Sequence, residues 1–228
     1  GRQRLLHHFP DFPAERVRAV HLGVDHTHFR VPAPERVAAT KARLGLKRPF
    51  LLQVGLLDRH KNPETSLAAF ADSCARAEGW ELVFAGGEAG DQRRILEERA
   101  RALGVADSVR LLGGVSGAEL PQLYAAAGLL LFPSWYEGFG LPVLEAMACG
   151  TAGVASSACG IPEIAAAAWP LADPAAPEAF AAAVDRLLQS PDRIDAARRS
   201  GLGHAARFTW ERCVKETIGF LELGSDNG

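Results

Sequence analysis

The chain has 228 residues, a formal net charge of −2 and a hydrophobic content of 48%. These values indicate a globular protein with one large domain and appendages, because two complete α/β domains normally need a longer chain. Residues 1–50 hold ten Lys and Arg against four Asp and Glu. This charge is spread out and not interleaved with aromatic residues, so we interpret it as a solvated or domain-facing surface and expect no nucleic-acid partner.

The cysteines and the apolar runs indicate in which cellular compartment the protein is expected. The four cysteines form neither CxxC pairs nor the dense spacing of a disulfide scaffold, which favours reduced thiols in a cytoplasmic protein. The longest apolar run, AAAGLLLFP, is far below the roughly 20 residues that span a bilayer, and no signal-like segment opens the chain. We expect a cytoplasmic protein with at most peripheral contact at the inner face of a membrane.

In chain order, residues 1–48 show one strand-like piece, a Gly-Val-Asp turn and a proline-bearing linker, which is typical of a connector. From there, short apolar runs alternate with segments of helical period, as βα units around a parallel sheet do. Residues 175–223 are predicted to be mostly helical, with Ser190 and Thr209 as N-caps. The expected strands are 49–55, 80–87, 109–115, 129–133 and one near 153–156, and the expected helices between them are 63–78, 91–104 and one near 117–127.

The segment SWYEGFGLPVLEAMACG, residues 134–150, predicts an anion site. If Pro142 is the first helical residue, the preceding glycine-bearing loop leaves free backbone N–H groups at the carboxyl edge of the sheet. Those groups and the helix dipole favour a phosphate. Glu137 in the loop and Glu145 about one turn into the helix would accept hydrogen bonds from hydroxyl groups, and a ligand with hydroxyls on both sides of a phosphate bridge is a nucleotide sugar.

A second anion-ready element follows the first strand, in VGLLDRHKNPETSLAAF. Asn62 is a suitable N-cap and Pro63 a suitable first helical residue. The helix start would place Lys61 at a mouth able to face a diphosphate, with Arg59 as a second candidate. The two elements follow separate strands, and the carboxyl ends of parallel strands share one edge of a sheet.

These residues resemble a known family. EGFGLPVLEAMACG looks like the E-x7-E signature of retaining glycosyltransferases with the GT-B fold, the glycosyl transferases group 1, which include glycogen-synthase-like enzymes and mannosyltransferases. VGLLDRHKN, LVFAGG, VRLLGGVS, GIPEI and FTWERC extend the resemblance, in order, over residues 20–223. It implies an α/β fold, a Rossmann-like doubly wound parallel sheet forming one half of a GT-B enzyme.

The resemblance also implies roles for individual residues. Glu137 is expected to contact the donor sugar, Glu145 the ribose, and Lys61 the leaving diphosphate. Relatives often have arginine just before the Lys-Asn pair, whereas this chain has His60 there and Arg59 one position earlier, so the second phosphate ligand stays open between these two. No metal and no cofactor is expected, and transfer proceeds with retention. The remaining donor-binding residues implied are Gly55, Gly86, Gly87, Leu112, Gly138, Phe139, Gly140 and Leu141.

The family's two-domain plan gives the expected organisation. Residues 1–48 would be the end of a missing N-terminal acceptor-binding domain and the linker, 49–207 the donor-binding domain, and 208–228 a helix crossing back to the missing domain. The chain alone would then be inactive. The full enzyme would transfer a hexosyl unit to a sugar or lipid-linked acceptor, and the Lys-Asn helix start favours GDP-mannose among the donors.

A nicotinamide oxidoreductase needs a Gly-x-Gly-x-x-Gly turn, and VGLLDRHKN offers one glycine. A non-catalytic nucleotide-sugar-binding module stays open. We interpret His26 and His28 as linker residues, not metal ligands, and Cys149 as a packed core thiol. Trp135 and Tyr136 would either stack on the base or wall the cleft.

Overall fold

The computed structural model describes residues 1–225 and contains one six-stranded sheet in which every pairing is parallel. The strand order is β3-β2-β1-β4-β5-β6, the doubly wound order in which successive strands are added to one side of β1 and then, from β4 on, to its other side. The predicted parallel sheet is confirmed, and β6 is an addition. The strands are β1 Phe50–Val54, β2 Glu81–Ala85, β3 Val109–Leu111, β4 Leu129–Phe132, β5 Ala152–Ser156 and β6 Leu171–Ala172.

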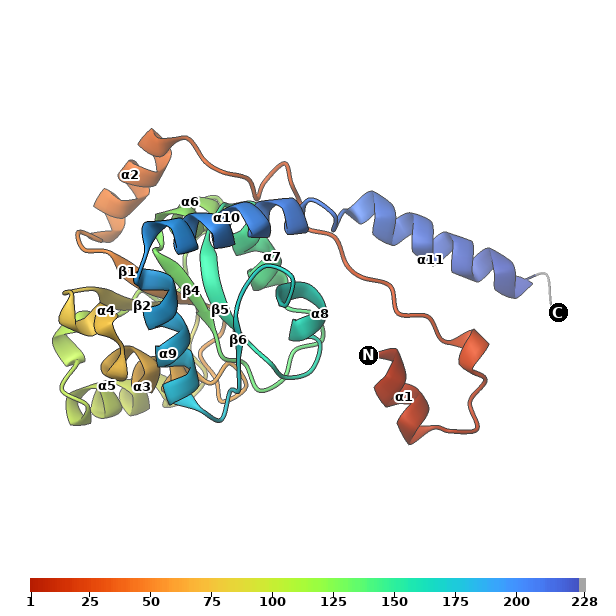
Figure 1. Cartoon of the computed structure of the whole chain (residues 1–228), viewed down its shortest axis with the longest axis horizontal. Helices are drawn as coiled ribbons and strands as arrows, with labels where there is room; N and C mark the ends of the chain where they lie inside the picture. The colour runs from red at the N-terminus through yellow and green to blue at the C-terminus, as the bar shows by residue number, and fades with distance from the viewer. Residues whose placement is uncertain (226–228) are drawn as a thin grey trace.

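Helices cover both faces of this sheet (Figure 1). Helix α3 packs against α5 and α9 on one side, and α7 packs against α6 and α10 on the other. The helices are α1 Arg2–His8, α2 Pro34–Leu44, α3 Pro63–Asp72, α4 Cys74–Ala77, α5 Gln92–Ala102, α6 Leu120–Ala126, α7 Leu141–Ala148, α8 Ile161–Ala165, α9 Pro177–Leu188, α10 Pro191–Ala205 and α11 Trp210–Ser225, with short 3-10 turns at Ala14–Arg16 and Ala106–Ser108.

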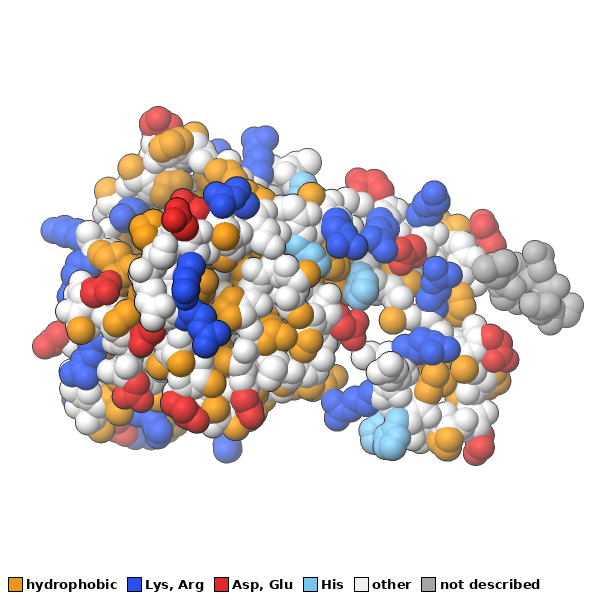
Figure 2. All heavy atoms as spheres, in the orientation of Figure 1, with side chains coloured by type: hydrophobic (Ala, Val, Ile, Leu, Met, Phe, Trp, Pro, Cys, Tyr) orange, Lys and Arg blue, Asp and Glu red, His pale blue; other side chains and the backbone are white. Residues whose placement is uncertain are grey.

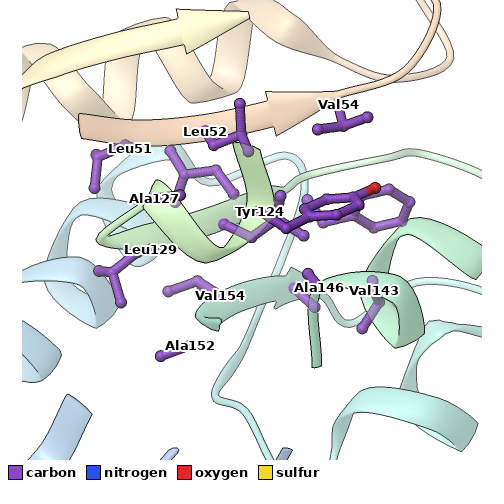
Figure 3. Close-up of a cluster of buried hydrophobic side chains, with 14 of the residues drawn as sticks. Leu51, Leu52, Val54, Tyr124, Ala127, Leu129, Val143, Ala146, Ala152 and Val154 are labelled. Atoms are coloured by element: carbon purple, nitrogen blue, oxygen red, sulfur yellow. The ribbon is translucent and has the colours of Figure 1, made fainter. Parts of the chain in front are cut away.

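The core lies between the sheet and these helices. Every residue of β1, β2, β4 and β5 is buried, which is why these segments are almost continuously apolar instead of alternating. Figure 3 shows the layer between β1, β4 and β5 and the helices α6 and α7, where Leu52, Tyr124 and Val154 are wholly buried. Cys149 lies in the same core, as predicted, and burial raises the pKa of its thiol to about 12.

One predicted helix is two helices. The expected helix over 63–78 is interrupted at Ser73, whose backbone is extended. The Ser73 hydroxyl donates to the carbonyl of Phe70, and the backbone N–H of Cys74 donates to the Asp185 carboxylate of α9 at 2.8 Å. Asp185 therefore caps the start of α4 from 111 residues away, a contact that the periodicity of residues 63–78 does not contain.

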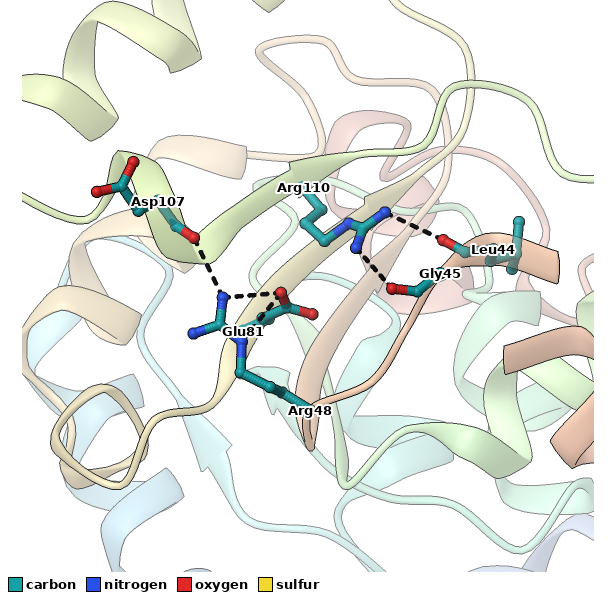
Figure 4. Close-up of polar contacts among 6 residues, drawn as sticks. All are labelled: Leu44, Gly45, Arg48, Glu81, Asp107 and Arg110. Carbon is teal, nitrogen blue, oxygen red and sulfur yellow. Dashed lines mark hydrogen bonds and ion pairs between the residues drawn. The ribbon is translucent and has the colours of Figure 1, made fainter. Parts of the chain in front are cut away.

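Residues 1–48 also depart from the expected connector. They contain α1 and α2, and the strand-like piece near 17–22 pairs with no described strand. Helix α2 packs on α6, and Gly45 ends it in the left-handed conformation at φ 66°. In Figure 4 the Arg110 guanidinium donates to the carbonyls of Leu44 and Gly45, so a strand residue secures the helix end.

Figure 4 shows a second basic side chain at this amino edge of the sheet. The Arg48 guanidinium donates to the buried Glu81 carboxylate at 2.9 Å and to the carbonyl of Asp107. These contacts join the chain entering β1 to β2 and to the turn before β3. They lie at the opposite strand ends from the candidate site described below.

The predicted helix caps near the end of the chain are confirmed. The Ser190 hydroxyl accepts from the N–H of Asp192, and the Thr209 hydroxyl accepts from the N–H of Arg212. Helix α11 continues past the expected end to Ser225.

Two arms, residues 1–22 and helix α11, extend from the body on the same side (Figures 1 and 2). They meet where they leave it: the N–H of Val24 donates to the carbonyl of Phe208, and a side chain on Gly23 would overlap the backbone of Trp210. Within residues 1–225, no helix has the length and apolar character needed to cross a bilayer. The domain bounds expected at residues 48 and 207 stay predictions.

Candidate functional site

The candidate site lies at the carboxyl ends of β1 and β4, where the winding of the sheet reverses. Each strand runs into a loop that leads to a helix, residues 55–62 before α3 and residues 133–140 before α7. The N–H of Trp135 donates to the carbonyl of His60 at 3.0 Å, which fastens one loop to the other. The position is therefore defined by backbone contacts as well as by side chains.

Lys61 and Glu137 meet at this point. The Lys61 Nζ lies 2.5 Å from Glu137 Oε1, and both side chains are about one-sixth exposed, at 17% and 16%. The ammonium also lies 5.0 Å from the centre of the Phe132 ring, an electrostatically favourable position for a cation. A partly dry ion pair of this kind interacts more strongly than one at the surface.

Asp58 shapes the loop that presents Lys61. Its carboxylate oxygen accepts from the backbone N–H groups of His60 and Lys61, each at 3.0 Å, which closes a tight turn. The carbonyl of Lys61 accepts from the buried Gln53 amide at 2.8 Å. Sequence reasoning missed both residues, although an aspartate two residues before a basic pair is a recognisable turn signal.

Gly55 and Gly86 allow the strand ends to approach closely. A side chain on Gly86 would lie 1.8 Å from the Gly55 carbonyl oxygen, and one on Gly55 would lie 3.0 Å from the Lys61 side chain. Both have positive φ, 131° for Gly55 and 154° for Gly86, a region that favours glycine. The two predicted glycines thus have a packing reason for their identity that is independent of any ligand.

The phosphate loop predicted before α7 differs in one detail from expectation. The helix begins at Leu141, so Pro142 is the second helical residue, not the first. Gly140 precedes it with φ 98° and is buried against Ile161. Within residues 1–225, the backbone N–H groups of residues 138–141 donate to no other group of the protein, so they are free to donate to a ligand.

Glu145 lies one turn into α7 and is half-buried. Its Oε2 accepts a hydrogen bond from the Tyr124 hydroxyl at 2.8 Å. Burial raises the pKa of the Glu145 carboxyl, while the hydrogen bond from Tyr124 and the charges of His28 and Lys61 lower it. The Lys61 ammonium therefore acts on both predicted acids, directly on Glu137 and through space on Glu145.

The other predicted residues are less closely engaged. Arg59 is exposed and has no hydrogen bond or ion pair with the rest of the described chain, whereas the His60 ring lies 6.0 Å from the Tyr136 ring. Leu112 is partly buried against the core, beyond the end of β3, and Gly87 is exposed beyond the end of β2. The structure brings Lys61 and Glu137 together, and within the described residues neither the Arg59 nor the His60 side chain forms a hydrogen bond or ion pair with them.

Asn62 differs from its predicted role. It precedes α3 as expected, with φ 52°, but its side chain makes no capping bond. Its amide instead donates to the carbonyls of Pro133 and Pro174, at 3.1 and 2.8 Å. The left-handed backbone turns the side chain away from the helix, so Asn62 joins three loops at the carboxyl edge.

A groove of about 1040 Å³ runs between the N-terminal arm and the loop that carries Glu137. Tyr136 and Phe139 line it on the body side. The guanidinium carbon of Arg4, in the arm, lies 5.9 Å from the centre of the Tyr136 ring. Tyr136 is thus a wall of this groove, while the question whether it or Trp135 stacks on a base stays open.

The linker histidines bind backbone. His26 Nε2 lies 3.2 Å from the carbonyl of Phe208, and His28 Nε2 lies 2.9 Å from that of Gly117. Within the described residues, no group of three or more His, Cys, Asp or Glu is arranged to hold a metal ion.

A model of the family described as glycosyl transferases group 1 matches residues 37–207. The chain is 36% identical over 203 residues to a D-inositol 3-phosphate glycosyltransferase of Segniliparus rotundus, covering 86% of this chain and 44% of that protein. It is 33% identical over 220 residues to O-antigen chain mannosyltransferase B of Escherichia coli, covering 93% and 56%.

Among solved structures, Anabaena HepE in complex with UDP and glucose superimposes with a TM-score of 0.83 at 21% identity, over 92% of this chain and 58% of that one. The expected fold, one Rossmann-like half of a GT-B glycosyltransferase, is confirmed. The chain spans about half the length of the curated relatives named above. With a family model covering most of its length and two relatives more than 30% identical, this chain belongs to the glycosyl transferases group 1 family.

Proposed function

We propose that this chain forms the nucleotide-sugar donor site of a retaining glycosyltransferase that transfers a hexosyl unit to a sugar or lipid-linked acceptor. The observation that carries the proposal is the meeting of Lys61 and Glu137 beside the N–H groups of residues 138–141. A cation and free amides suit a diphosphate, and a carboxylate beside them suits the hydroxyls of the attached sugar. The relatives named as glycosyltransferases and the UDP and glucose bound by HepE support this assignment.

The donor would enter between two charges that already neutralise each other. A diphosphate at the start of α7 competes with Glu137 for the Lys61 ammonium, and the exchange frees the Glu137 carboxylate to accept hydrogen bonds from sugar hydroxyls. Glu145, one turn further along the same helix, is positioned for the ribose hydroxyls. The three side chains then hold the sugar, the phosphates and the ribose in their order along the donor.

In the proposed reaction, the bond between the anomeric carbon and the leaving phosphate oxygen breaks while the acceptor oxygen bonds the same face of that carbon. The acceptor proton passes to the leaving phosphate oxygen. Lys61 stabilises the negative charge that develops on the diphosphate, which is electrostatic stabilisation of the transition state. Residues 138–141 add backbone N–H groups at the same oxygens.

Calorimetry with UDP, GDP and ADP tests the proposal on this chain. We expect one of the three to bind, with GDP favoured by the Lys-Asn helix start, which resembles that of mannosyltransferases. Failure of a folded sample to bind any of them would contradict the proposal.

Two substitutions separate the assigned roles. Lys61→Ala should lower the affinity for the nucleoside diphosphate by about tenfold or more, because a charge-assisted contact is lost. It should lower the affinity for the corresponding monophosphate less. Glu137→Ala should change nucleotide affinity little and should depress turnover in an enzyme that includes an acceptor domain. Equal, negligible effects of both substitutions would remove the assignment.

A further inference from the structure

Tyr124 is a buried polar group that none of the roles above uses. Its ring is wholly buried on α6, among the apolar side chains of β1 and α7 (Figure 3). The hydroxyl is the polar end of an otherwise apolar side chain, and a buried hydroxyl without a partner is costly. Its partner is Glu145 Oε2 at 2.8 Å, so the buried hydroxyl of Tyr124 points toward the candidate site.

The hydrogen bond has one direction. Burial and the neighbouring Glu145 charge raise the pKa of Tyr124 well above its ordinary value, so the hydroxyl keeps its proton and donates. Glu145 Oε1 accepts from no other residue of the described chain. Tyr124 of α6 thus holds one oxygen of the Glu145 carboxylate, and the other oxygen is left for a ligand.

The backbone around Tyr124 is also fixed. The Thr151 hydroxyl donates to the Tyr124 carbonyl at 2.8 Å, and the Phe29 ring packs edge-on against the Tyr124 ring, with centres 6.3 Å apart. A donor held on several sides presents its hydroxyl in one place. It therefore restricts the rotamers of Glu145 before any ligand arrives.

The charged and titratable groups that face Glu145 are few. Burial raises the pKa of its carboxyl, whereas Tyr124, His28 and Lys61 lower it. Cys149 also lies near, and burial raises the pKa of its thiol to about 12, so the thiol stays neutral. Tyr124 is the one of these groups that touches the carboxylate, and it does so without carrying a charge.

We propose that Tyr124 is the positioning residue of the donor site: its hydroxyl holds the Glu145 carboxylate in the orientation in which it accepts hydrogen bonds from the ribose hydroxyls of the nucleotide. This rests on the proposed function, because it assumes that Glu145 meets a ribose. It adds a residue on a different helix that touches no ligand. The simpler alternative is that the hydrogen bond satisfies a buried hydroxyl and affects stability alone.

Tyr124→Phe removes the hydroxyl and keeps the ring. The probes are the nucleoside diphosphate that the chain binds best, its 2′,3′-dideoxy analogue and inorganic pyrophosphate, measured by calorimetry. The wild type should bind the dideoxy analogue about tenfold more weakly than the ribonucleotide. Tyr124→Phe should bind the ribonucleotide about tenfold more weakly than the wild type and discriminate little between the two nucleotides. Pyrophosphate affinity should not change.

The pH dependence gives a readout that a structural role would not move. Binding of the ribonucleotide requires the ionised carboxylate, so affinity falls as the pH drops through the pKa of Glu145. Loss of the Tyr124 donor raises that pKa further, so in Tyr124→Phe the fall should begin at a higher pH. Because His28 also lowers the pKa of the Glu145 carboxyl, the comparison is repeated in a His28→Gln background. In Glu145→Gln, whose side chain cannot ionise, this fall in affinity at low pH should be absent.

The outcomes are separable. If the wild type binds no nucleoside diphosphate, the proposed function fails. If the wild type discriminates between ribose and dideoxyribose and folded Tyr124→Phe keeps the same discrimination and the same pH profile, the role of Tyr124 is overturned while the donor site stands. If Tyr124→Phe does not fold, Tyr124 in the wild type labelled with 3-fluorotyrosine should show a 19F shift on nucleotide binding and none with pyrophosphate; equal shifts would overturn the proposal.

Discussion

The sheet body and the two arms use apolar residues in opposite ways. In the body, β1, β2, β4 and β5 are buried along their whole length, with helices on both faces. In the arms, α1 has no buried residue, and α11 exposes a stripe of apolar side chains at helical spacing. That stripe comprises Trp210, Val214, Ile218 and Leu221.

The difference shows where the folding free energy of this chain resides. Apolar area removed from water stabilises by about 25 cal/mol per Å², so the body contributes and the exposed arm faces do not. Lys61, Glu137 and Glu145 all lie on the body, at or just beyond strand ends whose positions the core determines. The expectation that α11 crosses back to another domain stays a prediction, and the arm's exposed stripe has the character it requires.

The largest expected effect is the loss of stability when a side chain is added at Gly86, where the ends of β1 and β2 approach closely. Gly86→Ala would place a Cβ 1.8 Å from the Gly55 carbonyl oxygen in a backbone region that L-residues rarely adopt. We expect a loss of about 3 kcal/mol or more in the free energy of unfolding, measured by denaturant titration, or failure to fold. Gly90→Ala is the matched control: Gly90 also has positive φ, 58°, but open space around it, so the cost should be about 1 kcal/mol. Similar values for both would contradict the packing argument.

The next effect concerns the junction of three loops. Asn62→Ala removes both hydrogen bonds to the carbonyls of Pro133 and Pro174 and leaves alanine in a left-handed conformation. The expected loss is about 2–3 kcal/mol, seen in urea unfolding. Asn62→Gly, which removes the same bonds without backbone strain, should cost less. If Asn62→Ala is as stable as the wild type, the junction does not depend on this side chain.

A smaller effect separates stability from binding. Arg48→Met removes the partner of the buried Glu81 carboxylate at the amino edge of the sheet. Because the Arg48 side chain is itself 43% exposed, the loss should be only about 1–2 kcal/mol. Nucleotide affinity, measured by calorimetry, should not change, since these contacts lie at the strand ends opposite the candidate site. A parallel loss of affinity would contradict that separation.

The smallest effect sharpens the comparison directly. Ile218→Ser replaces a half-exposed residue of α11 and should change the free energy of unfolding by no more than about 0.5 kcal/mol. Ile164→Ser makes the same chemical change at a wholly buried position of the body and should cost about 3 kcal/mol or more. Thermal unfolding of the two variants side by side measures the contrast, and equal shifts would show that α11 is packed in solution.

Much of this architecture was predictable from local patterns. The strands ending at Val54, Ala85 and Phe132 lie within the predicted ranges, and the caps at Ser190 and Thr209 are where turn chemistry placed them. Continuous apolar runs and helical periods depend on neighbours within a few residues. For the same reason the glycine and proline run before α7 was recognisable, although its helix starts one residue earlier than expected.

Other features required residues far apart in the chain. The break between α3 and α4 depends on Asp185, which periodicity over residues 63–78 does not include. Helix α2 was missed because its prolines were interpreted as a linker, although Pro34 lies in the first helical turn. Its packing against α6 is a long-range contact that local patterns do not contain. The Asn62 side chain was expected to cap a helix and instead binds carbonyls 71 and 112 residues away.

The sequence by itself determined the βα alternation, the family resemblance and the identity of the charged residues in the two motifs. Only the tertiary structure decided that Lys61 pairs with Glu137 while Arg59 stays exposed, and that Tyr124 donates to Glu145. The physical reason is one of range. Backbone propensity and periodicity act within a turn or a strand, whereas the ion pair and the hydrogen bond join residues 76 and 21 positions apart, which the sheet alone brings together.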